Sequence, residues 1–123
     1  MLYAILCYNS EEAVGSWTKE EDEATMARLT VVQKKLEREK RLGPVARLLP
    51  TTAATTLRKG RETLVIDGPF AETKEQLLGF WVVECASLDE ALETARELAR
   101  ANPGTGAYEI RPVGYYHGGS AAT

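Results

Sequence analysis

The side chains best suited to chemistry are concentrated between positions 67 and 76, in the segment DGPFAETKEQ. Asp67 is followed directly by glycine and proline, which interrupt regular structure and fix a turn. A carboxylate held on such a turn could act as a general base, so Asp67 is the candidate catalytic residue. Glu72 and Lys74 follow as candidate ligand-binding residues, because a lysine can pair with an anionic group or with a neighbouring carboxylate.

The same segment also fits a purely structural turn. Asp67 would then accept backbone amides, and Lys74 would be solvated. Arg111 is the remaining candidate for ligand binding, since a fixed cation in a cleft would favour anionic or phenolic ligands. The alternative role for Arg111 is a structural ion pair with a nearby carboxylate. The spacing of these residues does not choose between the two interpretations.

Other kinds of site are not indicated. Cys7 and Cys85 stand apart and are expected to be buried, reduced thiols. His117 is the single histidine and lies near a glycine-rich end. Clustered zinc ligands, a nucleophile beside a base and a dinucleotide fingerprint are all missing, so we expect neither a metal nor a cofactor.

Length and charge narrow the class of protein. A chain of 123 residues fits one domain, and a formal net charge of −3 gives no broad basic surface for nucleic acid. No apolar run reaches the roughly 20 residues of a membrane span, and the N-terminal residues show no charged region followed by an apolar stretch. We therefore expect a cytoplasmic protein that binds neither nucleic acid nor membrane.

Hydrophobic spacing and capping residues predict strands and helices that alternate along the chain. Thr18 with Glu21, and Ser87 with Glu90, have the spacing of capping boxes at the starts of two helices. Gly43 and Pro44 are expected to end the first helix. Strands are predicted at residues 2–8, 45–49, 55–58, 63–66, 78–85 and 108–113, with the third and fourth joined as a hairpin.

This order matches the α+β arrangement called ferredoxin-like, a split βαβ fold. The strands at residues 2–8 and 78–83 are apolar at both alternating sets of positions, so the second face of the sheet needs cover. A homodimer is the simplest way to provide it. We expect one domain over residues 1–114 and a flexible tail over 115–123.

Four stretches carry a resemblance to a known family: the run at 67–76, Gly79, the sequence LDEA at 88–91 and the sequence EIRPV at 109–113. Together they resemble the DGPF branch of the YCII-related proteins, over most of the chain. The resemblance implies a ferredoxin-like fold paired as a dimeric α/β barrel. YCII proteins proper carry a histidine early in the first helix, suggested to work with an aspartate. The matching segment at 26–29 contains none and is preceded by Thr25.

Two functions follow as hypotheses, since most functions in the family are unassigned. One member is a dehydrochlorinase acting on a chlorinated aromatic. The first hypothesis is a dimer that binds a small polar or aromatic molecule beside the sheet, with acid-base, lyase-like catalysis, through Asp67, Glu72, Lys74 and Arg111. The second is a non-catalytic interaction or regulatory module, because DGPF proteins are often linked with extracytoplasmic-function sigma factors. An enclosed cavity with convergent polar groups would favour the first.

Overall fold

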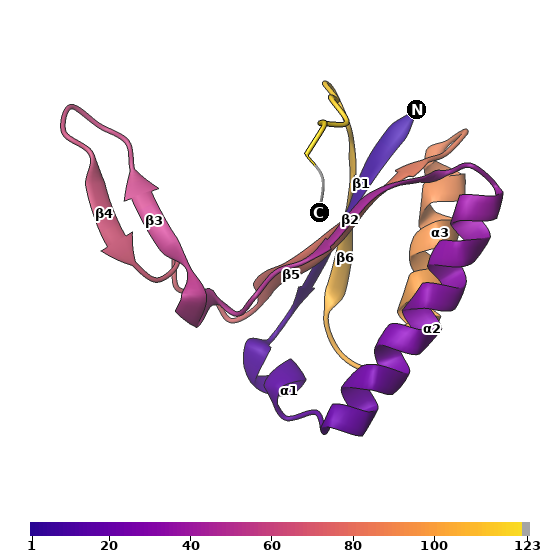
Figure 1. Ribbon diagram of the computed structural model, residues 1–123, viewed down its shortest axis with the longest axis horizontal. Coiled ribbons are helices and arrows are strands. Elements are labelled where there is room, and N and C mark those ends of the chain that lie inside the picture. The colour runs from indigo at the N-terminus through magenta and orange to yellow at the C-terminus, as the bar shows by residue number, and fades with distance from the viewer. Residues whose placement is uncertain (122–123) are drawn as a thin grey trace.

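The computed structural model describes residues 1–121 as an antiparallel sheet with two helices on one face (Figure 1). The elements are β1 (Leu2–Asn9), α1 (Glu11–Gly15), α2 (Lys19–Arg38), β2 (Leu42–Arg47), the 3-10 turn η1 (Thr51–Ala53), β3 (Thr55–Arg58), β4 (Leu64–Asp67), β5 (Gln76–Glu84), α3 (Leu88–Ala101) and β6 (Ala107–Pro112). The sheet order is β2-β5-β1-β6, while β3 and β4 form a separate sheet. This topology confirms the ferredoxin-like α+β fold.

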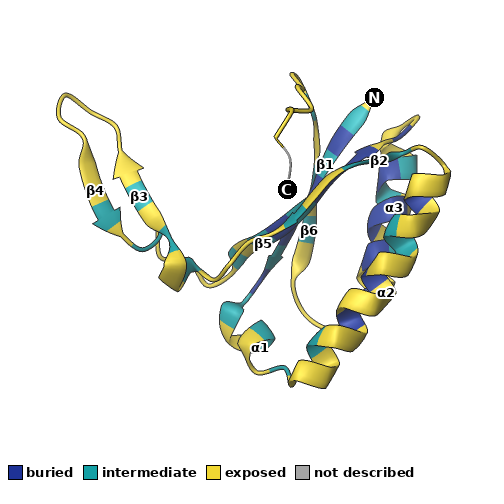
Figure 2. Ribbon diagram, viewed as in Figure 1, coloured by how far each residue is buried: buried dark blue, intermediate teal, exposed yellow. Residues whose placement is uncertain are grey.

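The core lies between the sheet and the helices, as the burial colours show (Figure 2). Alternate residues of β1 point into it, namely Tyr3, Ile5 and Cys7, and they face Val83 and Trp81 across the β1–β5 register. Helix α2 adds Leu29 and Leu36, and helix α3 adds Ala91, Ala95 and Leu98. Each helix buries one stripe, as its periodicity predicts.

The other face of the sheet is turned away from both helices. We call it the open face and define it by Ala4, Leu6, Phe80, Val82, Glu109 and Arg111, which share one side in the strand registers. Its apolar members lie on the two interior strands, where both faces were predicted to be apolar. In Figure 1 no helix lies on this side of the sheet.

The two predicted capping boxes have different outcomes. Thr18 accepts the Glu21 N–H at 3.0 Å and donates its own N–H to the Glu21 carboxylate at 3.3 Å, so the first box is confirmed. Ser87 accepts the Glu90 N–H at 3.2 Å, but the Glu90 carboxylate accepts the N–H of Ala86. The second box is therefore only half formed.

Helix α2 ends earlier than predicted. Lys40 takes a left-handed φ of 58°, and the N–H of Arg41 donates to the Leu36 carbonyl at 2.9 Å. This is a Schellman closure made without glycine. The prediction that Gly43 and Pro44 end the helix was wrong, because both lie inside β2, an edge strand where the missing proline N–H is tolerated.

Two further elements complete the fold. Helix α1 was not predicted, and it connects β1 to α2. The predicted hairpin is confirmed, and it extends from the side of the sheet opposite α2 and α3 (Figure 1). We call this hairpin, residues 55–67, the arm. The flexibility of residues 115–123 stays a prediction, and residues 122 and 123 lie outside the described part.

Candidate functional site

A cavity of about 180 Å³ lies between α2 and the helix-facing side of the sheet. Its apolar wall comes from β5, β2, α2 and the segment that joins α1 to α2. Its lining includes Cys7, Trp17, Thr25, Met26, Leu29, Gln33, Arg47, Gly79, Trp81 and Asn102.

Gly79 shapes one side of this cavity. It faces Cys7 in the β1–β5 register and Arg47 in the β2–β5 register. A Cβ atom at Gly79 would lie 2.4 Å from the carbonyl oxygen of Ala46. Glycine is therefore required for β2 to approach β5 this closely, and it leaves this part of the wall without a side chain.

The two tryptophans of the chain both line the cavity. Trp81 packs edge-on against Tyr108, with ring centroids 5.7 Å apart, and its indole N–H donates to the Gln33 side-chain oxygen at 3.1 Å. These contacts hold the Trp81 ring in one orientation. The Gln33 amide nitrogen makes no hydrogen bond within residues 1–121, so it is available to a bound molecule.

The thiol and phenol beside the cavity are uncharged at neutral pH. Burial raises the pKa of Tyr108 to about 12, and burial likewise raises the pKa of the Cys7 thiol. Asn102 donates to the Tyr108 hydroxyl at 3.3 Å, and that hydroxyl donates to the Leu98 carbonyl at 3.5 Å. Because the thiolate is the reactive form of cysteine, Cys7 is a poor nucleophile.

Arg47 supplies the cationic group among the lining residues. Its guanidinium contacts both carboxylate oxygens of Asp22, at 2.8 and 3.2 Å, and these hydrogen bonds lower the Asp22 pKa. Among the described residues, the lining includes no carboxylate, imidazole or lysine. The cavity therefore offers aromatic surface and hydrogen-bonding groups, and no general base.

The four residues predicted from the sequence lie elsewhere. Asp67 is exposed at the end of β4, and Glu72 and Lys74 are exposed in the loop before β5. Arg111 lies on the open face opposite Ala4. None of the four lines the cavity, and Lys74 lines a second, open hollow with Glu11, Glu12 and Glu75. The roles proposed for these four residues stay predictions.

The sequence predicted that Met26 and Leu29 belong to the core. Leu29 does lie in the buried core and also lines the cavity, whereas Met26 is 37% exposed and lines the cavity at its edge. Thr25 was noted only because it stands before the segment that lacks the family's histidine. It also lines the cavity, where its hydroxyl donates to the Glu21 carbonyl at 2.9 Å and accepts from Arg28 at 3.1 Å. The sequence signal that could have indicated this cavity is Thr25, a polar residue beside the apolar stripe of the helix.

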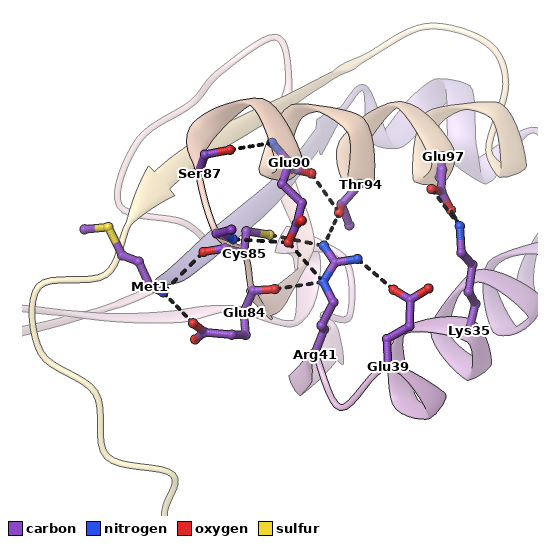
Figure 3. A network of polar contacts seen from close by, with 11 residues as sticks. Met1, Lys35, Glu39, Arg41, Glu84, Cys85, Ser87, Glu90, Thr94 and Glu97 are labelled. Carbon is purple, nitrogen blue, oxygen red and sulfur yellow. Dashed lines mark hydrogen bonds and ion pairs between the residues drawn. The ribbon is translucent and has the colours of Figure 1, made fainter.

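A second polar cluster surrounds Arg41 at the other end of the sheet (Figure 3). Its guanidinium donates to the Glu84 carbonyl at 2.9 Å, to Glu39 at 2.9 Å and to the Thr94 hydroxyl at 2.8 Å. Each of its three nitrogens has a protein partner. The cluster therefore joins the connection between α2 and β2 to β5 and α3.

Residues 1–121 contain no group of three histidine, cysteine, aspartate or glutamate side chains arranged to hold a metal ion. None of the described helices combines the length and apolar character needed to cross a bilayer.

Comparison with known proteins identifies a family and a relative. The model of the YCII-related domain matches residues 1–114. An uncharacterised protein of Rhizobium meliloti (strain 1021) is 62% identical over 120 residues, which cover 97% of this chain and 97% of that protein. The family match covers the whole sheet, both long helices and the arm.

Proposed function

The chain belongs to the YCII-related family, and we propose that it binds a small molecule with a single aromatic ring in the cavity beside α2. The observation that carries this proposal is a cavity of about 180 Å³ lined by both tryptophans and by Gln33, whose amide nitrogen has no hydrogen-bond partner within residues 1–121. An engineered apolar cavity of about 150 Å³ binds benzene, so the size suits one substituted ring.

The lining also favours a particular substituent on that ring. Gln33 presents an amide donor, and Arg47 adds a positive charge at the lining, with both terminal nitrogens already donating to Asp22. An amide donor suits an oxygen acceptor, and the remaining N–H groups of the guanidinium suit a carboxylate or a phenolate. Benzoate is therefore a suitable probe, and toluene is the matching compound without the oxygen atoms.

Binding is better supported than acid-base catalysis. Lyase-like chemistry needs a group that removes a proton within hydrogen-bond reach of the substrate. The titratable lining groups are Cys7, whose raised pKa keeps it protonated, and Arg47, which is always charged. Catalysis through Asp67, and a regulatory role with a sigma factor, stay predictions.

Blocking the cavity tests the proposal. Met26 lines it and is 37% exposed, so Met26→Trp should fill the mouth without disturbing the buried stripe of α2. Val31 lies on the same helix, is 68% exposed and is not a lining residue, which makes Val31→Trp the matched control. Ligand-observed NMR should detect benzoate binding to the parent and to Val31→Trp, and not to Met26→Trp. Equal binding by all three proteins would refute this site.

We also propose that two copies pair through the open face. Its apolar residues lie on the interior strands, and Glu109 and Arg111 present opposite charges beside them. A two-fold axis places the same surface patch of each protomer against that of its partner. Glu109 of one copy can then pair with Arg111 of the other. Light scattering should give twice the chain mass of 13.5 kDa, and a monomer would contradict this proposal.

A further inference from the structure

The arm is the part of the molecule with the least support from the rest of the fold. Its two strands pair with each other, Leu57 opposite Val65, and they belong to a sheet of their own. In Figure 1 the arm extends away from the helices, and Figure 2 shows most of it exposed. Leu57 is 58% exposed and Val65 is 65% exposed.

An arm of this kind needs cover. An isolated two-stranded hairpin is marginally stable in water, because it buries too little apolar surface to hold its backbone in place. Leu57 and Val65 form a cross-strand apolar pair on one face of the hairpin, and Leu64 on the other face is 57% exposed. Apolar residues gathered on a projecting element mark an interaction surface.

Two observations favour a second copy of this chain as the partner. The arm extends on the side of the sheet that carries the open face, where the proposed dimer places the partner (Figure 1). The tip of the arm contains three cations, Arg58, Lys59 and Arg61, and one carboxylate, Glu62, on a chain whose formal net charge is −3. Within residues 1–121 none of these cations forms an ion pair. A basic tip on an acidic protein is complementary to another copy of it.

We propose that the arm of each protomer packs against the body of its partner, with Leu57 and Val65 in the contact and the basic tip beside acidic groups. This inference rests on the proposed dimer and adds a reciprocal clasp to it. The arm then gains the packing that it lacks within one chain. The exchange is symmetric, so both arms are covered by one association.

The first test compares dimer dissociation constants by sedimentation equilibrium. The double variant Leu57→Glu, Val65→Glu places charges in the proposed contact, and both positions are exposed enough to leave the single chain folded. Val31→Glu on α2 is the matched control. The double variant should weaken the dimer by about tenfold or more, and the control should not. If the parent is a dimer and the double variant has the same dissociation constant, the role of the arm is overturned. The open-face dimer then stands without it.

The second test locates the contact. Leu57 is replaced by the photo-crosslinking residue benzoylphenylalanine, and labelled and unlabelled chains are mixed before irradiation. The clasp predicts crosslinks between a labelled chain and an unlabelled chain. Each crosslink should join position 57 of one protomer to a peptide from the body of its partner. Crosslinks confined to one chain, or formed only with a different protein in a host extract, would overturn it. A monomeric parent would overturn both the clasp and the dimer. It would not decide the binding proposal, because benzoate binding is measured in a separate experiment.

Discussion

The indole N–H of Trp81 on β5 donates to the side-chain oxygen of Gln33 on α2 at 3.1 Å. This bond crosses the cavity wall and joins the sheet to the helix. Because Trp81 is only 6% exposed, its N–H depends on this acceptor. The pair therefore contributes both to the stability of the fold and to the shape of the site.

Replacing Gln33 by leucine should expose this dependence. Gln33→Leu leaves the Trp81 donor unpaired, which should lower the free energy of unfolding by about 1 to 3 kcal/mol. Urea denaturation of both single variants and of the double variant with Trp81→Phe measures the coupling. Strictly additive effects would show that the hydrogen bond contributes nothing.

Gly79 should not tolerate even one added carbon. Gly79→Ala places a Cβ atom 2.4 Å from the Ala46 carbonyl oxygen, so β2 must move away from β5. The expected loss is about 1 to 3 kcal/mol, the usual cost of overpacking. Gly15 has no atom within 4 Å of its Cβ position, so Gly15→Ala is the control and should not destabilise. Equal melting temperatures for the two variants would contradict the close strand approach.

The left-handed Lys40 offers a stabilising change. Its φ of 58° costs a residue with a side chain roughly 1 to 2 kcal/mol, a cost that glycine avoids. Lys40→Gly should therefore raise the free energy of unfolding by up to about 1 kcal/mol, after the greater chain entropy of glycine is subtracted. Lys34→Gly, inside the same helix, should lower it by about 1 kcal/mol. A loss of stability at position 40 would mean that the Schellman closure is not formed in solution.

Stability should fall in alkaline solution. The pKa values of Cys7 and Tyr108 are raised by burial, so the folded state holds these protons more tightly than the unfolded chain. Their contribution is complete below about pH 8.5, the ordinary thiol value, and is lost as the pH rises towards the folded-state values.

Melting temperatures from pH 7 to 11.5 measure this dependence. Tyr108→Phe should flatten the fall above about pH 10, where an ordinary phenol begins to ionise. Tyr115→Phe, at a position 85% exposed, should behave like the parent. Parallel curves for all three proteins would refute the contribution of Tyr108.

The sequence was sufficient for the fold because the local signals agreed with the final packing. The capping box at Thr18 and the apolar strands lie where they were predicted. The end of α2 was missed because Lys40, a residue with no preference for a positive φ, closes the helix. The cavity was missed for a different reason: its wall combines residues from β1, α2, β2 and β5, and no single segment shows that they converge.

The four candidate residues, Asp67, Glu72, Lys74 and Arg111, were chosen because charged groups and a glycine-proline turn stand out in a sequence. The structure spreads them over the arm, a loop and β6. Trp17, Gln33 and Trp81 carry the proposed site instead. Tryptophan and glutamine in apolar surroundings resemble ordinary core or surface positions, so their convergence could be recognised only in three dimensions.

The most direct test of the binding proposal uses the two tryptophans of the chain. A ¹⁵N-labelled protein should give two indole N–H signals, and the spectrum of Trp17→Phe assigns them. Since both rings line the cavity, titration with benzoate should shift both signals along a saturable curve, and toluene should bind more weakly because it lacks an acceptor for Gln33. Indole signals that stay in place at saturating benzoate, while other residues shift, would contradict the account.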